Sequence, residues 1–243
     1  MSLNLHQFPI SHYCEKVRWA LDYKGLDHRL RNHLPGFHVK RIRRMAPRTS
    51  VPVLAHDGKV VQGSSDIITH LDEAFPARPL TPSDQAQRNQ VLEWERYCDS
   101  EIGPHVRRLC YDTLLRHPRQ VIPLLAHDGP FWGRPVLRLV FPRLRRTMRR
   151  FMAIREPEVT RSREALELAL DELNSSLEGR DYLVGGHFTR ADLAAASLLA
   201  PLFMPAGYGL DWPQSVPSPL RGWVDNHQQQ LVWARQMYEH HRL

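Results

Sequence analysis

A proline-rich, polar segment at Pro76–Gln85, PARPLTPSDQ, divides the sequence into two parts with different patterns. Before it, short apolar or alternating runs typical of strands occur between stretches with helical periodicity. After it, the strand patterns disappear and the periodic stretches have helical spacing. The segment itself has the composition of an interdomain linker. The sequence therefore predicts a mixed α/β domain at residues 1–79, a linker at 80–86 and an all-α domain at 87–243.

The stretch from Phe8 to Gly25 predicts a strand end, a tight turn and an amphipathic helix. Ser11 occupies the N-cap position of that helix, and Gly25 supplies its stop. Apolar residues follow Ser11 at helical spacing: Cys14, Val17 and Leu21. A helix start offers unpaired backbone N–H groups and the positive end of the macrodipole, which favour a thiolate over a thiol. We therefore interpret this helix start as the place where a thiol is activated.

The S-x-x-C spacing allows Ser11 and Cys14 to have different functions. The Ser11 hydroxyl can donate a hydrogen bond to a bound thiolate, whereas Cys14, one turn into the helix, can itself be a nucleophile. The apolar residues that follow Cys14 at helical spacing favour a buried thiol over a reactive one. His12 adjoins Ser11, but a side chain on the first turn of a helix is expected to face water. The spacing alone leaves the choice between Ser11 and Cys14 open.

A hairpin follows in the first half of the sequence. An apolar run at Val51–Ala55 is joined by an Asp-Gly turn to a second short strand. Pro52 cannot donate to a strand ladder, so it belongs at an edge, at a bulge or in a cis turn, and we favour the cis bond. Ser64 and Ser65 then open another helical pattern. That helix start can bind a carboxylate through its N–H groups, or Ser64 can simply cap its own helix. Weaker alternation predicts two earlier strands, at Leu3–Phe8 and Asp27–Leu34.

The composition argues against several classes of protein. Hydrophobic residues make up 42% and charged residues 24% of the chain, and no apolar run approaches the length of a membrane span. The N-terminal residues MSLNLHQF have neither a basic leader nor an apolar core of a signal peptide. The three cysteines form no C-x-x-C pair and no zinc-like cluster, which indicates neither a disulfide framework nor a metal site. We therefore expect a cytoplasmic protein.

A basic segment accounts for much of the formal charge of +7. Residues 129–155 contain eight arginines and no carboxylate, a pattern that can attract nucleic acid, anionic lipid or acidic ligands. The arginines alternate with apolar residues, however, as they do in amphipathic helices with a solvated basic face. No nucleic-acid-binding motif accompanies them. We therefore expect no nucleic-acid partner.

Four features now stand in a fixed order along the chain. They are S-x-x-C at the first helix, Val-Pro before a hairpin, serines at a later helix start, and a T-x-x-D capping box at Thr189–Asp192. Together they resemble the cytosolic glutathione transferase superfamily over essentially the whole chain. The resemblance implies a thioredoxin-like N-terminal domain with a mixed sheet and helices, followed by an all-α C-terminal domain. It also implies a homodimer.

The resemblance implies a role for each matched residue. Val51, before the cis proline Pro52, would pair its backbone with the cysteinyl part of glutathione. Ser64, assisted by Ser65, would receive the γ-glutamyl carboxylate. Ser11 matches the residue that stabilises the glutathione thiolate in serine-type members. Glutathione would thus be a co-substrate, and no metal is implied. A basic side chain would neutralise the glycyl carboxylate, with Lys40, Arg43 and Arg48 as candidates.

Three hypotheses follow for function. In the first, the protein is a glutathione transferase whose bound thiolate attacks an electrophilic, hydrophobic molecule held by the helical domain. In the second, it is a glutathione-dependent thiol-disulfide or dehalogenating reductase that uses Cys14, because Ser11 and Cys14 also match the nucleophilic and resolving cysteines of glutaredoxins. In the third, it is a non-catalytic glutathione-fold protein that binds ligands through its basic segment.

Overall fold

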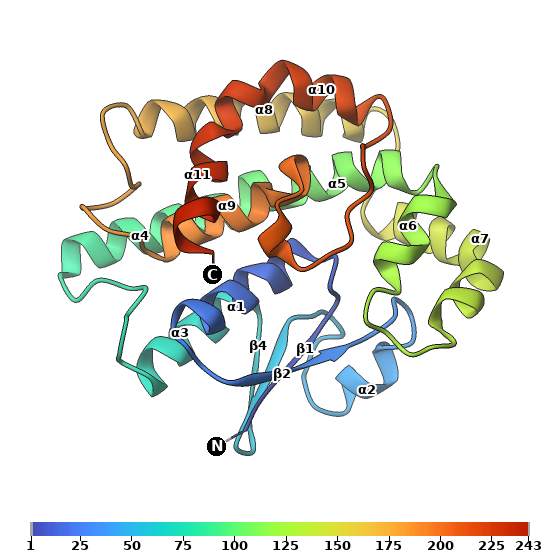
Figure 1. Ribbon diagram of the computed structural model, residues 1–243, viewed down its shortest axis with the longest axis horizontal. Coiled ribbons are helices and arrows are strands. Elements are labelled where there is room, and N and C mark those ends of the chain that lie inside the picture. Colours follow the sequence, from blue (N-terminus) through green and yellow to red (C-terminus); the bar gives the residue numbers. More distant parts are fainter. Residues whose placement is uncertain (1, 243) are drawn as a thin grey trace.

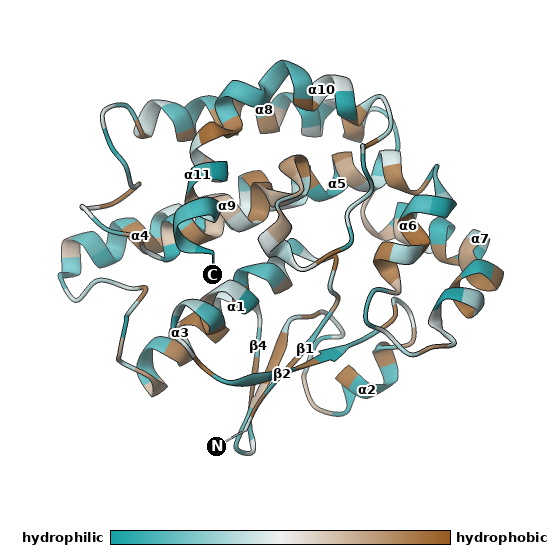
Figure 2. Ribbon diagram, viewed as in Figure 1, coloured by the Kyte–Doolittle hydropathy of each residue, from teal (hydrophilic) through white to brown (hydrophobic). Residues whose placement is uncertain are grey.

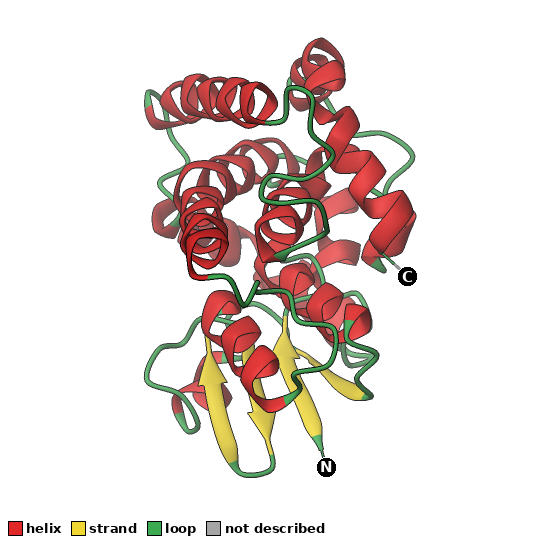
Figure 3. Cartoon of the chain, turned by 90° about the vertical axis from the view of Figure 1, so that its left-hand side faces the viewer, coloured by secondary structure: helices red, strands yellow, loops and turns green. Residues whose placement is uncertain are grey.

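The computed structural model describes residues 2–242, with a four-stranded sheet at one end and helices packed over it (Figures 1 and 3). The N-terminal elements are β1 (Leu3–Gln7), α1 (His12–Tyr23), β2 (His28–Asn32), α2 (Val39–Arg43), β3 (Val53–His56), β4 (Lys59–Gln62) and α3 (Ser64–Ala74). The strand order is β2-β1-β3-β4, in which β1 runs parallel to β2 and antiparallel to β3, and β3 is antiparallel to β4. This mixed sheet confirms the predicted α/β fold of the N-terminal domain.

The second half of the described chain is entirely helical. Its helices are α4 (Gln85–Tyr97), α5 (Gly103–Leu114), α6 (Pro118–Leu125), α7 (Gly133–Phe151), α8 (Glu158–Ser176), α9 (Arg190–Phe203), α10 (Leu220–His227) and α11 (Val232–His241). A π-helical segment, η1 (Cys98–Ile102), joins α4 to α5, and two short 3₁₀ segments are η2 (Ala206–Tyr208) and η3 (Gln228–Leu231). Within residues 2–242, no helix combines the length and apolar character that crossing a membrane requires.

The predicted hairpin and its proline are confirmed. The Val51-Pro52 peptide bond is cis, and β3 begins just after it, at Val53. β2 covers only part of the predicted Asp27–Leu34 strand and lies at the edge of the sheet. Its three central residues are exposed, which explains why alternation was weak there.

Helix α9 lies at the centre of the helical half and is hydrophobic along most of its length (Figure 2). All of its residues except Pro201 are buried. Its start has the predicted capping box, in which the Thr189 backbone N–H donates to Asp192 Oδ2 over 2.8 Å and the Thr189 hydroxyl accepts from the Ala191 N–H. Asp192 also accepts the Leu183 N–H over 2.8 Å, so the box holds the preceding loop as well.

Helix α1 is buried between the N-terminal sheet with α3 on one side and α9 on the other (Figure 1). His12 is only 4% exposed, so the prediction that it faces water is wrong. The reason is that the helical domain covers the face of α1 that an isolated α/β domain would leave in solvent. Burial, and secondarily the nearby charge of Arg107, lowers the pKa of His12 to about 3.

The buried charges of α1 are paired with residues from the helical half. Lys16 Nζ lies 2.8 Å from Glu95 Oε1 and 2.9 Å from Asp99 Oδ2. Arg190, at the start of α9, contacts the other oxygen of Glu95 over 2.7 Å. A buried charge without a partner costs several kcal/mol, so this cluster couples the position of α1 to α4, η1 and α9.

Tyr13 joins the first helix to the start of α5 in a tight contact. Its hydroxyl donates to the Asp99 carbonyl over 2.8 Å and packs directly against Gly103. A side chain at Gly103 would overlap the Tyr13 hydroxyl. This close approach explains why a glycine stands at the first position of α5.

We expect Gly103→Ala to lower the free energy of unfolding by about 1–3 kcal/mol, because the added methyl group displaces Tyr13. Gly222→Ala is the matched control, since Gly222 also lies in a helix and nothing is within 4 Å of the position of its added Cβ. Helix propensity predicts that Gly222→Ala stabilises the protein by roughly 0.5–1 kcal/mol. Urea unfolding measures both changes, and equal effects of the two substitutions would contradict the steric explanation.

The burial of His12 predicts a loss of stability in acid. Because the pKa of His12 is about 3 when folded and near 6.5 when unfolded, its stabilising contribution is complete above pH 6.5 and disappears as the pH falls towards 3. The loss is on the order of 1 kcal/mol per pH unit inside that window. We expect His12→Gln to lose less stability between pH 7 and pH 5 than the wild-type protein, as measured by urea unfolding. The exposed His187→Gln control should follow the wild type.

Candidate active site

A cavity of about 420 Å³ lies between the N-terminal domain and the helical domain. The start of α1, the loop before α2 and the loop before Pro52 form one wall. Helices α5 and α7 and the segment between α9 and α10 form the opposite wall. Of the predicted site residues, Ser11 and Val51 line the cavity. The others do not: Cys14, Pro52, Ser64 and Ser65.

Ser11 combines a helix-capping backbone with a side chain that makes no capping bond. Its backbone is extended (φ −80°, ψ 121°), and its carbonyl accepts the N–H groups of Cys14 and Glu15 over 3.0 and 2.9 Å. The Ser11 hydroxyl does not bond to the helix N–H groups. An acceptor placed at this end of the cavity would therefore meet a hydroxyl together with the positive end of the α1 dipole.

Cys14 is fully buried one turn further into α1. Burial raises the pKa of its thiol, and hydrogen bonding to the Ser11 side chain and the Phe8 backbone only partly opposes that shift. A buried thiol with a raised pKa is a poor nucleophile at neutral pH. Cys14 therefore has neither the exposure nor the low pKa that a reactive thiol requires.

Gln62 holds the loop before the cis proline by its side-chain amide. Its Nε2 donates to the carbonyls of Arg48 and Ser50 over 2.7 and 2.8 Å, and its Oε1 accepts the Arg48 N–H over 3.0 Å. The Pro52 carbonyl accepts the Gly63 N–H over 3.1 Å. These bonds fix the backbone on either side of Val51. The sequence analysis did not identify Gln62, because a glutamine at the end of a short strand has no distinctive pattern.

The two serines of α3 differ in their surroundings. Ser64 is the first residue of the helix and is buried, and Gly63 occupies the cap position, so the alternative that Ser64 caps its own helix is wrong. No hydrogen bond within residues 2–242 engages the Ser64 hydroxyl. The Ser65 hydroxyl, in contrast, donates to Asp99 Oδ2 over 2.7 Å and accepts from Lys16 Nζ over 3.2 Å. Ser65 thus belongs to the buried charge cluster of α1.

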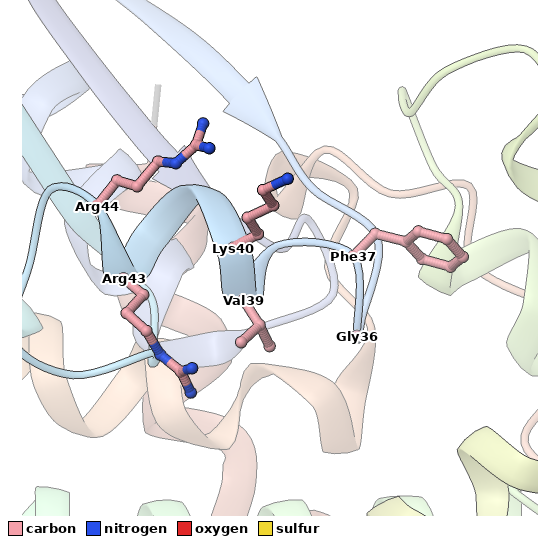
Figure 4. A pocket seen from close by; sticks show the side chains of 6 residues that line it. All are labelled: Gly36, Phe37, Val39, Lys40, Arg43 and Arg44. Carbon is pink, nitrogen blue, oxygen red and sulfur yellow. The ribbon is translucent and has the colours of Figure 1, made fainter.

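A second, shallower hollow of about 540 Å³ lies beside α2. Figure 4 shows that Lys40 and Arg44 extend to the same side of the helix, whereas Arg43 points the other way. The exposed basic side chains of α2 offer an anion-binding surface close to the cavity, because Gly36 and Val39 line both the hollow and the cavity. The third candidate for the glycyl carboxylate, Arg48, lies on the loop that Gln62 holds.

The helical wall of the cavity carries residues that the sequence analysis did not identify. Arg107 and Tyr111 are one turn apart on α5, and both line the cavity. Their spacing puts them on one helix face, but it cannot show which face meets the N-terminal domain. Burial raises the pKa of Tyr111 and of Tyr13, so neither phenol ionises at neutral pH. No group of three possible metal-ligating side chains occurs in the described chain.

Comparisons with known proteins match both halves of the chain. Residues 5–79 match the glutathione S-transferase N-terminal domain, and residues 156–226 match the glutathione S-transferase C-terminal domain. The chain is 29% identical over 213 residues to glutathione S-transferase TCHQD of Arabidopsis thaliana, covering 82% of this chain and 77% of that protein. It is 24% identical over 204 residues to protein LigF of Sphingobium, covering 77% of this chain and 73% of LigF.

Solved structures confirm the fold over nearly the whole chain. A glutathione S-transferase from Methylobacterium radiotolerans, in complex with glutathione sulfonate, has a TM-score of 0.64 at 24% identity and matches 99% of this chain and 92% of that one. The β-etherase LigF of Sphingobium has a TM-score of 0.60 at 22% identity, covering 98% of this chain and 99% of that one. Since both domains match in the expected order, this chain belongs to the glutathione S-transferase superfamily.

Proposed function

We propose that this protein is a glutathione transferase that ionises the thiol of bound glutathione at the N-terminal end of α1. The observation that carries the proposal is the Ser11 side chain, which lines the interdomain cavity and is not used to cap its helix. A thiolate beside Ser11 would accept a hydrogen bond from the hydroxyl and would be stabilised by the helix dipole. Burial of Cys14 argues against the reductase alternative.

The binding residues proposed for the rest of the tripeptide all lie on the N-terminal domain. Val51 precedes the cis peptide bond and has a backbone held by neighbouring hydrogen bonds, so it can pair with the cysteinyl part of glutathione. Ser64 has an unused hydroxyl at the first position of α3, where helix N–H groups favour the γ-glutamyl carboxylate. Ser65 supports this site through its bonds to Asp99 and Lys16.

Bound glutathione supplies the nucleophilic sulfur, which forms a bond to an electrophilic carbon while the leaving group departs with the electrons of the broken bond. The chain contributes three things to this reaction. Ser11 and α1 hold the sulfur as thiolate, Val51 and Ser64 position the tripeptide, and the apolar cavity between the domains holds a hydrophobic co-substrate. A lowered thiol pKa raises the thiolate fraction near neutral pH at some cost in intrinsic nucleophilicity.

The relatives support an enzymatic function that uses glutathione. Two are described as a glutathione S-transferase and a β-etherase, and a similar structure contains glutathione sulfonate. A homodimer and a cytoplasmic location, where glutathione is kept reduced, belong to this proposal. The proposal includes no nucleic-acid partner.

We expect Ser11→Ala to raise the pKa of the bound thiol towards its value in free glutathione and to lower kcat/KM about 10-fold to 100-fold, because a charge-assisted hydrogen bond is lost. Glutathione binding should change little, since Val51 and Ser64 are intact. Ultraviolet titration of the thiolate and the pH profile of kcat/KM measure these effects.

Cys14→Ser is the matched control, because Cys14 does not line the cavity. We expect it to retain the thiol pKa and the turnover of the wild-type protein. If Cys14→Ser abolished turnover while Ser11→Ala left the thiol pKa unchanged, the proposal would be wrong and the reductase alternative would gain support.

A further inference from the structure

The interdomain cavity has unusual electrostatics for a hydrophobic site. No aspartate or glutamate is among the described residues that line it, and Arg107 is its one arginine or lysine. Two histidines, His12 and His38, also contribute to the walls, but burial lowers the pKa of both, so they are neutral at pH 7. The cavity therefore contains a single fixed positive charge and no fixed negative charge to balance it.

Arg107 has no partner within residues 2–242. No hydrogen bond or ion pair to its guanidinium occurs there, and its Nε is buried without an acceptor. The adjacent Arg108 is different, because it donates to the Met152 carbonyl over 3.0 Å and to the Ser162 hydroxyl. The buried Lys16 and Arg190 have partners as well, since both contact the carboxylate of Glu95. Arg107 thus stands apart from its neighbour and from the buried cations of the α1 cluster.

The position of Arg107 brings its charge close to the reactive end of the cavity. Arg107 lines the same cavity as Ser11 and His12. Burial lowers the pKa of His12, and the charge of Arg107 adds to that shift. Aromatic rings from both domains line the same space: Phe8, Tyr13, Tyr111, Phe151 and Trp212. A guanidinium among apolar and aromatic walls fits an aromatic ligand that carries one negative charge.

We propose that Arg107 forms an anion subsite for the co-substrate, so that the protein selects aromatic electrophiles bearing a carboxylate or a similar anionic group. The inference rests on the proposed function, because it takes the cavity to hold the co-substrate. The other anion that Arg107 would meet in this site is a carboxylate of glutathione itself. We assign the two glutathione carboxylates to Ser64 and to the basic residues of α2, which lie on the N-terminal domain, whereas Arg107 lies on the facing helix α5.

The arginine-rich segment supports this inference from outside the cavity. The inner face of α7, including Leu144 and Met148, lines the cavity, while Arg138 and Arg146 are exposed on its outer face. A concentration of positive charge around a cavity attracts anionic ligands and raises their association rates. The segment therefore has a function in this proposal that requires no nucleic acid or membrane.

The test compares an anionic substrate with a neutral one of the same shape: 4-chloro-3-nitrobenzoate and its methyl ester, each with glutathione. We expect Arg107→Met to lower kcat/KM for the benzoate about 10-fold to 100-fold, mainly through KM, because a charge-assisted hydrogen bond is lost. The ester should change less than about 3-fold, and the KM for glutathione should stay the same. Arg107→Lys, which keeps the charge, should recover part of the preference.

Arg138→Met is the matched control, because it removes the same charge from the outer face of α7. It should weaken the benzoate preference slightly, and only at low salt. Equal losses for the benzoate and the ester in Arg107→Met would overturn the proposal. A rise in the KM for glutathione in Arg107→Met would also overturn it, because Arg107 would then hold the tripeptide. Thermal unfolding of each variant checks that the fold is retained.

A binding measurement separates failure of this inference from failure of the proposed function. Trp212 lines the cavity, so its fluorescence can report binding of 3-nitrobenzoate and of neutral 3-nitrobenzamide without any turnover. Preference for the benzoate that is lost in Arg107→Met would support the subsite even if neither electrophile reacted. Equal binding of the two compounds by the wild-type protein would overturn the subsite even if conjugation occurred.

Discussion

The ammonium group of Lys16 lies in the interior of the protein, bound to the carboxylates of Glu95 and Asp99. Such a charge is tolerated only where partners are present, so α1 is stable in its position because α4 and η1 supply them. Arg190 completes the cluster by binding Glu95 from the start of α9. This cluster holds the N-terminal helix against the helical domain and thereby sets the place of Ser11 in the cavity.

The cations at the domain interface are of two kinds, paired and unpaired. Lys16 and Arg190 are buried and paired, and their role is to hold helices together. Arg107 faces the cavity without a partner in the described chain. Since an unpaired cation in apolar surroundings reduces stability, its presence is understandable where a ligand supplies the missing charge. Ser64 likewise has a polar group without a partner in the described chain, because its hydroxyl at the start of α3 makes no hydrogen bond there.

Local patterns in the sequence predicted much of the fold. The Asp-Gly hairpin, the cis Pro52 and the Thr189–Asp192 capping box depend on neighbouring residues, and all three occur in the structure. The order of these motifs also predicted the two-domain architecture. The predictions failed or were weak where the surroundings of a residue are set by segments distant in the sequence. His12 was expected in water because the covering helices come from the second half of the chain, and the capping alternative for Ser64 missed the role of Gly63.

The sequence by itself determined the fold class and the residues at the start of α1, because helix caps, turns and the residue before a proline obey short-range rules. It made Ser11 the leading candidate, with Cys14 as the alternative, because the apolar residues that follow Cys14 at helical spacing favour a buried thiol. Only the tertiary structure shows that packing against the sheet and the helical domain buries the Cys14 thiol, whereas Ser11 lies on the cavity wall. The same packing brings Arg107 into the cavity. The burial and the electrostatic environment of a side chain depend on contacts between distant segments, and local sequence patterns do not predict those contacts.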